Sequence, residues 1–235
     1  MVDIHNHLLY GIDDGSKSIE ESIDVLKDLE QYGYTDIILT PHYITESRYS
    51  NPRSDNLERL KVLKEEVKKN NINIKLHLGN EIFMDDNIYD LLREGIISSL
   101  NDTNYLLIEL PLSGEYSGYI EVFKYLMGKG YNIILAHPER YIAFQEDFNK
   151  VYELEKIGIY FQSNLDSLVG RYGPAAEDMI IRLLKENLIS FLATDIHKKK
   201  HDYNIWNIAK KKALKYVTED VFNTLVNDNP SLLVD

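Results

Sequence analysis

Two histidines lie two residues apart in the segment Asp3-Ile4-His5-Asn6-His7, near the start of the chain and directly after a short apolar run. Side chains two positions apart on a strand project to the same side. Neutral imidazole is the commonest metal ligand among side chains, so one ion could bind both His5 and His7. This spacing predicts metal chemistry, provided that the rest of the chain brings further ligands to the same place.

The composition limits what other chemistry is open to the chain. Its 235 residues include no Cys, 7 His and 38 Asp plus Glu. Disulfides, thiolate ligands and a cysteine nucleophile are therefore excluded, which leaves His, Asp and Glu as the reactive groups. The net charge of −12 disfavours nucleic-acid binding, because a phosphate backbone attracts a basic surface. With no membrane span or secretion signal recognisable in the sequence, we expect a cytoplasmic enzyme.

Strand and helix patterns alternate along the chain and show how these groups could be positioned. Seven apolar, β-branched runs predict strands at residues 2–4, 36–40, 72–78, 105–110, 132–136, 159–162 and 189–194. Amphipathic stretches predict helices at residues 18–32, 54–70, 118–130, 147–157, 175–187 and 203–216. The order predicts an α/β fold with parallel strands, a (β/α)7 TIM-like barrel in a single domain over residues 1–235. An open flavodoxin-like sheet is the alternative.

Most of the predicted strands end at, or within about three positions of, a residue that can bind metal. In a (β/α) barrel the carboxyl ends of the strands form one face, so such residues converge there. Each of them alone would read as a hydrogen-bonded loop residue, but together they predict a metal site. The nine candidate ligands are His5, His7, Asp14, His42, Glu81, Glu109, His137, Asp195 and His197. Nine ligands exceed what one ion needs, so we expect two or three ions, with Glu81 able to bridge two of them.

Some assignments remain open at this level. Asp13-Asp14-Gly15 is also an ordinary turn sequence, and we prefer Asp14 over Asp13 as the ligand. His77 lies inside a predicted strand, where we expect it to be structural. All the candidate ligand atoms are nitrogen or oxygen, which suits manganese, iron or zinc without selecting among them.

These residues resemble the polymerase and histidinol phosphatase (PHP) superfamily of metallophosphoesterases over nearly the whole chain. Its capsule and exopolysaccharide branch is similar at the segments Gly11-Ile12-Asp13-Asp14-Gly15, Thr40-Pro41-His42, Gly79-Asn80-Glu81, Ala136-His137-Pro138-Glu139-Arg140, Gln162-Ser163-Asn164, Gly170-Arg171-Tyr172-Gly173 and Thr194-Asp195-Ile196-His197. Members of that branch are manganese-dependent protein-tyrosine phosphatases. The resemblance implies a distorted barrel and, as partner, the phosphorylated tyrosine-rich tail of a membrane-associated tyrosine kinase.

The resemblance also implies a trinuclear site and roles for single residues. The three implied ligand sets are His5, His7, Glu81 and Asp195; then Glu81, Glu109 and His137; then Asp14, His42 and His197. Arg140 would bind the phosphate. Many relatives have a second arginine shortly after the position of His197, where this chain has Lys198-Lys199-Lys200-His201. Lys200 or His201 could take over substrate binding, or the run could be a solvated basic loop.

The expected reaction is hydrolysis of a phosphomonoester by a metal-held hydroxide, with Arg140, Glu81 and Asp195 as the catalytic residues. Without a cysteine, a tyrosine phosphatase must use metal. Three alternatives stay open. The first is a small-molecule phosphatase acting on a substrate such as histidinol phosphate. The second is an amidohydrolase, which would commonly carry a lysine where Glu81 stands. The third is a non-catalytic metal-binding domain, which would show no phosphatase activity.

Overall fold

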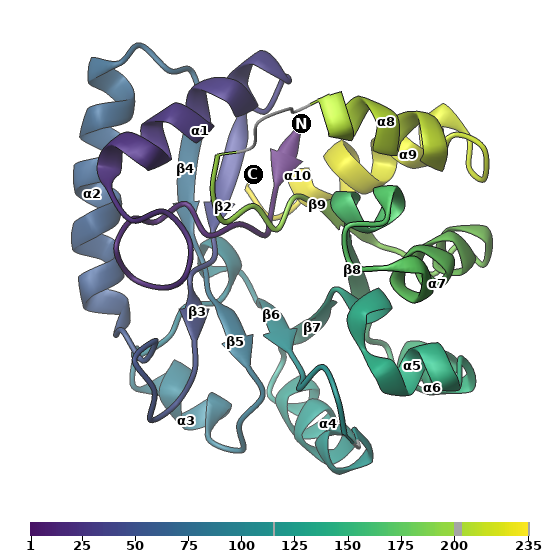
Figure 1. The fold of residues 1–235 in the computed structure, drawn as a ribbon. Coiled ribbons are helices and arrows are strands. Elements are labelled where there is room, and N and C mark those ends of the chain that lie inside the picture. The colour runs from purple at the N-terminus through teal and green to yellow at the C-terminus, as the bar shows by residue number, and fades with distance from the viewer. Residues whose placement is uncertain (115, 200–203, 235) are drawn as a thin grey trace.

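Parallel strands surrounded by helices make up this computed structural model, which describes residues 1–114, 116–199 and 204–234 (Figure 1). The strand segments are β1 (Val2–Asp3), β2 (Asp36–Leu39), β3 (His42–Tyr43), β4 (Lys75–Leu78), β5 (Glu81–Phe83), β6 (Tyr105–Glu109), β7 (Asn132–Ala136), β8 (Tyr160–Asn164) and β9 (Phe191–Ala193). Every pairing between them in the described residues is parallel. The predicted α/β class with parallel strands is therefore confirmed.

The helices are α1 (Ile19–Gln31), α2 (Arg53–Lys69), α3 (Ile88–Arg93), α4 (Ile120–Gly128), α5 (Ile142–Glu146), α6 (Asn149–Lys156), α7 (Pro174–Lys185), α8 (Asn204–Ala213), α9 (Glu219–Asn223) and α10 (Asn229–Ser231). The six predicted helices correspond to α1, α2, α4, α6, α7 and α8. Helix α1 begins where Ser18 caps it by accepting the backbone N–H of Glu21. The sequence did not predict the other four helices, because three to six residues are too few to show a helical period.

Two of the seven predicted strands, at residues 36–40 and 72–78, are followed after a two-residue break by a further short strand. Residues 36–43 form β2 and β3 with Thr40 and Pro41 between them, and residues 75–83 form β4 and β5 with Gly79 and Asn80 between them. Hydrogen bonds continue across both breaks, from the Gly79 N–H to the Leu39 carbonyl and from the Glu81 N–H to the Pro41 carbonyl. The two breaks nevertheless divide the regular pairing into two sheets, with the strand orders β1-β2-β4 and β3-β5-β6-β7-β8-β9.

The segments that directly follow β1 and β9, the first and last strands, lie next to each other. Asn6 and Ile196 form a parallel bridge, the Asp195 N–H donates to the His5 carbonyl, and the His7 N–H donates to the Ile196 carbonyl. An open sheet would leave these two strands apart. Among the described residues β4 and β6 belong to different sheets and do not pair, and Leu100 lies by the break at Gly79. A Cβ on Gly79 would come within 2.7 Å of the Leu100 side chain, so any larger residue at this position would force Leu100 to shift.

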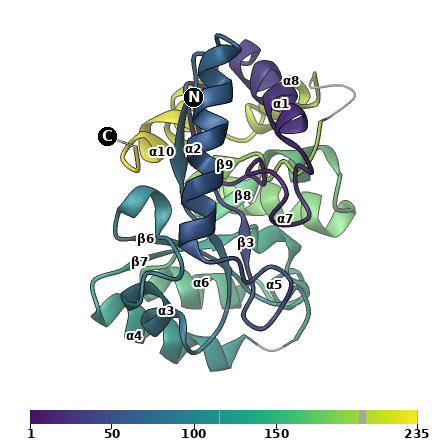
Figure 2. The ribbon, with the colours of Figure 1, turned by 90° about the vertical axis from the view of Figure 1, so that its left-hand side faces the viewer.

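The apolar core has an inner and an outer part. The outer part joins the helix faces to the strands, and helix α2 runs lengthwise along the outside of the molecule (Figure 2). The inner part takes alternate residues from the strands and consists of Val2, Ile4, Ile38, Leu100, Leu107, Ile134, Ala136, Phe191, Ala193 and Leu233. The strands therefore supply apolar side chains to the core, whereas Glu109 ends β6, and His42 and Glu81 follow the carboxyl ends of β2 and β4. Within the described residues no helix is long and apolar enough to cross a bilayer.

Candidate metal centre

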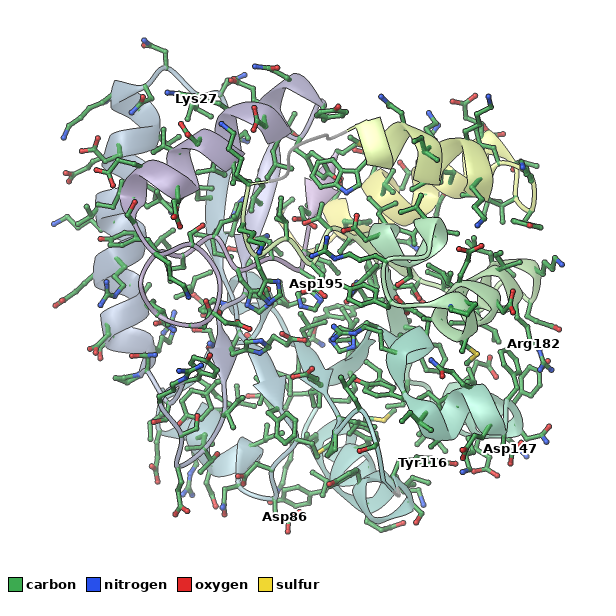
Figure 3. The ribbon with its side chains drawn as sticks, in the orientation of Figure 1. Lys27, Asp86, Tyr116, Asp147, Arg182 and Asp195 are labelled. Carbon is green, nitrogen blue, oxygen red and sulfur yellow. The ribbon has the colours of Figure 1, made fainter. Side chains whose placement is uncertain are left out.

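The carboxyl ends of the strands bring all nine predicted ligands together in the middle of the molecule, where Figure 3 shows Asp195 among nitrogen-bearing side chains. The labelled Lys27, Asp86 and Arg182 lie at the periphery. Four overlapping groups have ligand atoms within 4.8 Å of one another: His7, Asp14, His42 and His197; His5, His7 and Glu81; His5, His137 and Asp195; and His42, Glu81 and Glu109. Together these groups offer more ligand atoms than a single ion needs.

Glu81 stands at the centre, with only 1 % of its side chain exposed. Its Oε1 lies 3.0 Å from His137 Nε2 and 3.2 Å from His5 Nε2. Its Oε2 lies 3.0 Å from His42 Nδ1 and 3.3 Å from His7 Nε2. Burial alone would raise the pKa of Glu81, but His5 and His42 hold it well below its usual range. One ionised carboxylate thus faces two histidines with each of its oxygens, as a bridging ligand would.

Asp195 uses its two oxygens differently. Its Oδ1 lies 3.4 Å from His5 Nε2 and 3.5 Å from His7 Nε2. Its Oδ2 accepts a 2.6 Å hydrogen bond from the Asn164 side chain and one of 3.3 Å from Arg140. The backbone of Asp195 is in the left-handed region, with φ of 49°. A non-glycine residue is costly there, and such strain is concentrated at functional sites.

Two histidines are oriented from behind by partners outside the cluster. His7 Nδ1 lies 2.7 Å from Asp13 Oδ2, and His5 Nδ1 lies 2.7 Å from Gln162 Oε1. Gln162 is itself fixed by donating to Asn164. In a neutral ring the Nδ1–H donates to these oxygens, so each Nε2 points a lone pair into the cluster. Metal-binding histidines are commonly held in this way.

The Asp13 and Asp14 side chains point to different places. Asp13 is buried, and besides His7 it accepts the backbone N–H groups of Gly15 and His42. Asp14 Oδ1 lies 3.5 Å from the Nε2 atoms of both His42 and His197. The Asp14 carboxylate therefore faces the cluster, while Asp13 supports a histidine from outside.

Several buried atoms at the centre have no hydrogen-bond partner among the described residues. They are His5 Nε2, His7 Nε2, His42 Nδ1, Glu81 Oε2 and His137 Nδ1. Leaving a buried polar atom unpaired is costly, and four of the five belong to the groups around Glu81. Burial lowers the pKa of His5, yet Glu81 and Asp195 raise it to about 9. The Glu81 and Asp195 carboxylates thus favour positive charge beside them. Divalent ions bound to neutral histidines would supply that charge, so the donor set fits metal.

A cavity of about 400 Å³ opens above these residues. Besides the ligand candidates, it is lined by Ile44, Phe83, Arg140, Arg171 and Tyr172. The Arg140 guanidinium lies 4.5 Å from the centre of the Tyr172 ring, and the Tyr172 hydroxyl donates to Asp195 Oδ2. The cavity therefore combines a carboxylate and histidine floor with cationic and aromatic walls.

Other predicted residues do not lie at this centre or cannot be placed. His77 contacts Asp36 and Asn101, each at 3.1 Å, away from the cluster, which agrees with a structural role. Lys200 and His201 lie outside the described residues. The supporting positions of Asp13, Gln162 and Asn164 were not assigned from the sequence. Asp13 precedes the preferred ligand Asp14, and Gln162 and Asn164 lie on a strand end without a candidate ligand, so their only signal was that all three fall in segments of the family resemblance.

Comparisons with known proteins find relatives over the whole length of this chain. A family model described as "Capsular polysaccharide synthesis, CpsB/CapC" matches residues 1–235. The putative tyrosine-protein phosphatase CapC of Staphylococcus aureus is 37% identical over 202 residues, covering 84% of this chain and 77% of the relative. Tyrosine-protein phosphatase YwqE of Bacillus subtilis is 32% identical over 238 residues, covering 100% of this chain and 91% of the relative.

Solved structures are similar as well. One comes from crystallographic work on YwqE from Bacillus subtilis and CpsB from Streptococcus pneumoniae, described as unique metal-dependent tyrosine phosphatases. It matches with a TM-score of 0.83 and 30% identity, covering 100% of this chain and 91% of the other. Histidinol phosphate phosphatase from Lactococcus lactis matches with a TM-score of 0.60 and 17% identity, covering 92% and 93%. That second match shows a shared fold.

Proposed function

This chain belongs to the CpsB/CapC family of capsular polysaccharide synthesis, and on that premise we propose that it is a metal-dependent tyrosine-protein phosphatase. The observation that carries the proposal is the set of buried, unpartnered ligand atoms around Glu81. They lie on the floor of a cavity whose wall holds an arginine. A phosphate ester needs both kinds of group, cations for its oxygens and a fixed fork of donors for its orientation.

The proposed ligands divide among three ions. The first ion would take His5, His7, Glu81 and Asp195, the second Glu81, Glu109 and His137, and the third Asp14, His42 and His197. We propose manganese because the resemblance to the capsule and exopolysaccharide branch implies it; the nitrogen and oxygen donors of this chain, which has no cysteine, suit manganese as well as iron and zinc. Three divalent ions against four carboxylates leave a formal charge of about +2, which explains how an acidic protein could attract a phosphate.

The roles of this chain's residues follow from their contacts. When bound, the metal ions would supply an activated water and neutralise phosphate oxygens. Arg140 contacts Asp195 through one nitrogen and stacks on Tyr172, which leaves its other donors to orient the phosphoryl group. Asn164 and Tyr172 both donate to Asp195 Oδ2 and so hold Oδ1 toward His5 and His7. Glu81 contacts a ring nitrogen of each of four histidines and so fixes their positions relative to one another.

The proposed substrate is a tyrosine-phosphorylated protein, the tail of a membrane-associated tyrosine kinase. Two relatives are named as tyrosine-protein phosphatases, and the family model is one of capsular polysaccharide synthesis. A phenolate leaves comparatively readily, since its reference pKa is about 10. Hydrolysis of phosphotyrosine therefore suits a site that has no general-acid residue to protonate the leaving group.

Metal removal tests the function. The purified protein should hydrolyse para-nitrophenyl phosphate and phosphotyrosine peptides, and a chelator should lower the rate at least about a hundredfold because the floor loses its cations. Added manganese should restore the rate, and the chelated protein should melt at a lower temperature. A rate that survives complete chelation would contradict the metal mechanism. Faster turnover of histidinol phosphate than of the peptide would instead assign the same site to a small molecule.

Asp13→Asn tests the supporting groups separately from the ligands. An amide at Asp13 would turn its NH2 group toward either His7 and the His42 N–H or the Gly15 N–H, where donors already stand. We expect manganese affinity to fall about 10- to 100-fold, measured by calorimetric titration of the chelated protein. The exposed residue Asp86 offers the control, Asp86→Asn. Unchanged affinity in Asp13→Asn would show that His7 needs no partner.

A further inference from the structure

A second arginine, Arg171, lines the cavity beside Arg140. It follows the 3-10 turn Leu165–Val169 and precedes α7, in a short segment where Gly170 and Gly173 have φ of 77° and 90°. Left-handed backbone at both glycines lets the chain turn sharply on either side of Arg171. The Arg171 side chain is 48% exposed, against 21% for Arg140 and 2% for Asp195. Arg171 therefore stands at the mouth of the cavity and Arg140 closer to its floor.

The direction of the Arg171 side chain is set by a buried carboxylate. Arg171 Nε lies 3.5 Å from Asp166 Oδ2, and the Arg171 backbone N–H donates to the Asp166 carbonyl. The other carboxylate oxygen of Asp166 accepts a hydrogen bond from the indole N–H of Trp206 on α8. Asp166 contacts the Nε atom of Arg171. Among the described residues, no ion pair uses the two terminal nitrogens of the Arg171 guanidinium. The guanidinium is held at one end and available at the other.

The lysine run after His197 does not supply this charge within the described part of the chain. Lys199 Nζ lies 3.3 Å from Asp24 and 3.9 Å from Asp28, both on α1. Neither Lys198 nor Lys199 lines the cavity. Among the residues that the structure describes, Arg171 therefore brings positive charge to the cavity mouth, on a protein whose net charge of −12 repels anionic peptides.

We propose that Arg171 is a specificity-determining residue that binds an acidic side chain next to the phosphotyrosine of the substrate; this inference rests on the proposed function. Glu81 and Asp195 are each at most 2% exposed, whereas Arg171 is nearly half exposed. A phosphoryl group that reaches these two carboxylates therefore lies deeper in the cavity than Arg171. Arg140, which is less exposed, would contact the phosphoryl group, and Arg171, at the cavity mouth, would contact the peptide residues next to the phosphotyrosine. A charge fixed at this height favours carboxylates close to the phosphotyrosine.

Paired substrates test the proposal. One phosphotyrosine peptide carries Asp or Glu on both sides of the phosphotyrosine, and the other carries Asn or Gln at the same positions. We expect wild-type protein loaded with manganese to prefer the acidic peptide in kcat/KM, mainly through KM, and high salt should weaken this preference. Arg171→Gln should lower the acidic-to-neutral ratio about five- to tenfold, as expected for one charge-assisted contact at a partly exposed site. Arg171→Lys should retain part of the ratio.

The control and the opposing outcomes separate this inference from the function itself. Arg93 is also an exposed arginine paired with one aspartate, outside the cavity, so Arg93→Gln should leave the ratio unchanged. An unchanged ratio in Arg171→Gln, or equal losses on both peptides and on para-nitrophenyl phosphate, would overturn the proposal. Absence of wild-type turnover on every phosphotyrosine substrate would contradict the proposed function. Binding of the same peptide pair with a phosphonate in place of the phosphate would then still decide the role of Arg171.

Discussion

Glu81→Gln is expected to lower kcat for phosphotyrosine peptides by about a thousandfold or more. The substitution keeps the shape of the side chain but replaces one charged oxygen with an NH2 group. That group would face either His5 and His137 or His42 and His7, whose nitrogens lie 3.0 to 3.3 Å away. A bridging ligand lost from a buried site removes several kcal/mol of charge stabilisation, and each 1.36 kcal/mol is a factor of ten in rate.

Metal content measured by elemental analysis decides how Glu81 acts. If Glu81 bridges, Glu81→Gln should bind at least one ion fewer per chain than the wild type under the same loading conditions. Glu121 is 80% exposed and pairs with Lys124, so Glu121→Gln is the matched control and should match the wild type. Full metal content together with full activity in Glu81→Gln would exclude the bridging role.

Asp195→Asn should be the second most damaging substitution, with a loss of about a hundredfold or more in kcat/KM. If the new NH2 group takes the place of Oδ2, it faces the three donors Asn164, Arg140 and Tyr172, which lose their acceptor. If it faces the histidines, the cluster loses a charged ligand near His5 and His7. We expect kcat to fall in either orientation and KM to rise, because Arg140 also loses its anchor.

Steady-state kinetics over a range of manganese concentrations separate the two contributions of Asp195. Saturating manganese should recover part of kcat but should not restore KM, because excess metal does not rebuild the contact of Arg140 with Oδ2. The exposed Asp178 on α7 supplies the control Asp178→Asn. Complete recovery of both constants would show that Asp195 contributes to metal affinity alone.

Much of this architecture was predictable from local patterns. Alternating strand and helix periods indicated parallel strands, and the carboxyl ends of parallel strands lie on one face, so the positions of His42, His137 and Asp195 along the chain already implied proximity. The breaks after β2 and β4 were not predicted. Thr40-Pro41 and Gly79-Asn80 look like strand ends in sequence, and only the neighbouring strands show that pairing resumes beyond them at His42 and Glu81.

The sequence by itself determined which residue types could act and which strand ends would carry them. It did so because strand and helix periodicity are local properties and because the chain has no cysteine to supply a thiolate ligand or nucleophile. The tertiary structure alone decided which atoms face one another. The Asp195 N–H donates to the His5 carbonyl across 190 positions of sequence, Asp13 turns behind His7 while Asp14 turns toward His42, and Arg171 reaches the cavity mouth from a turn held by Asp166. Such contacts depend on strand order, on backbone strain at single residues and on side-chain packing between distant segments, none of which has a local sequence signal.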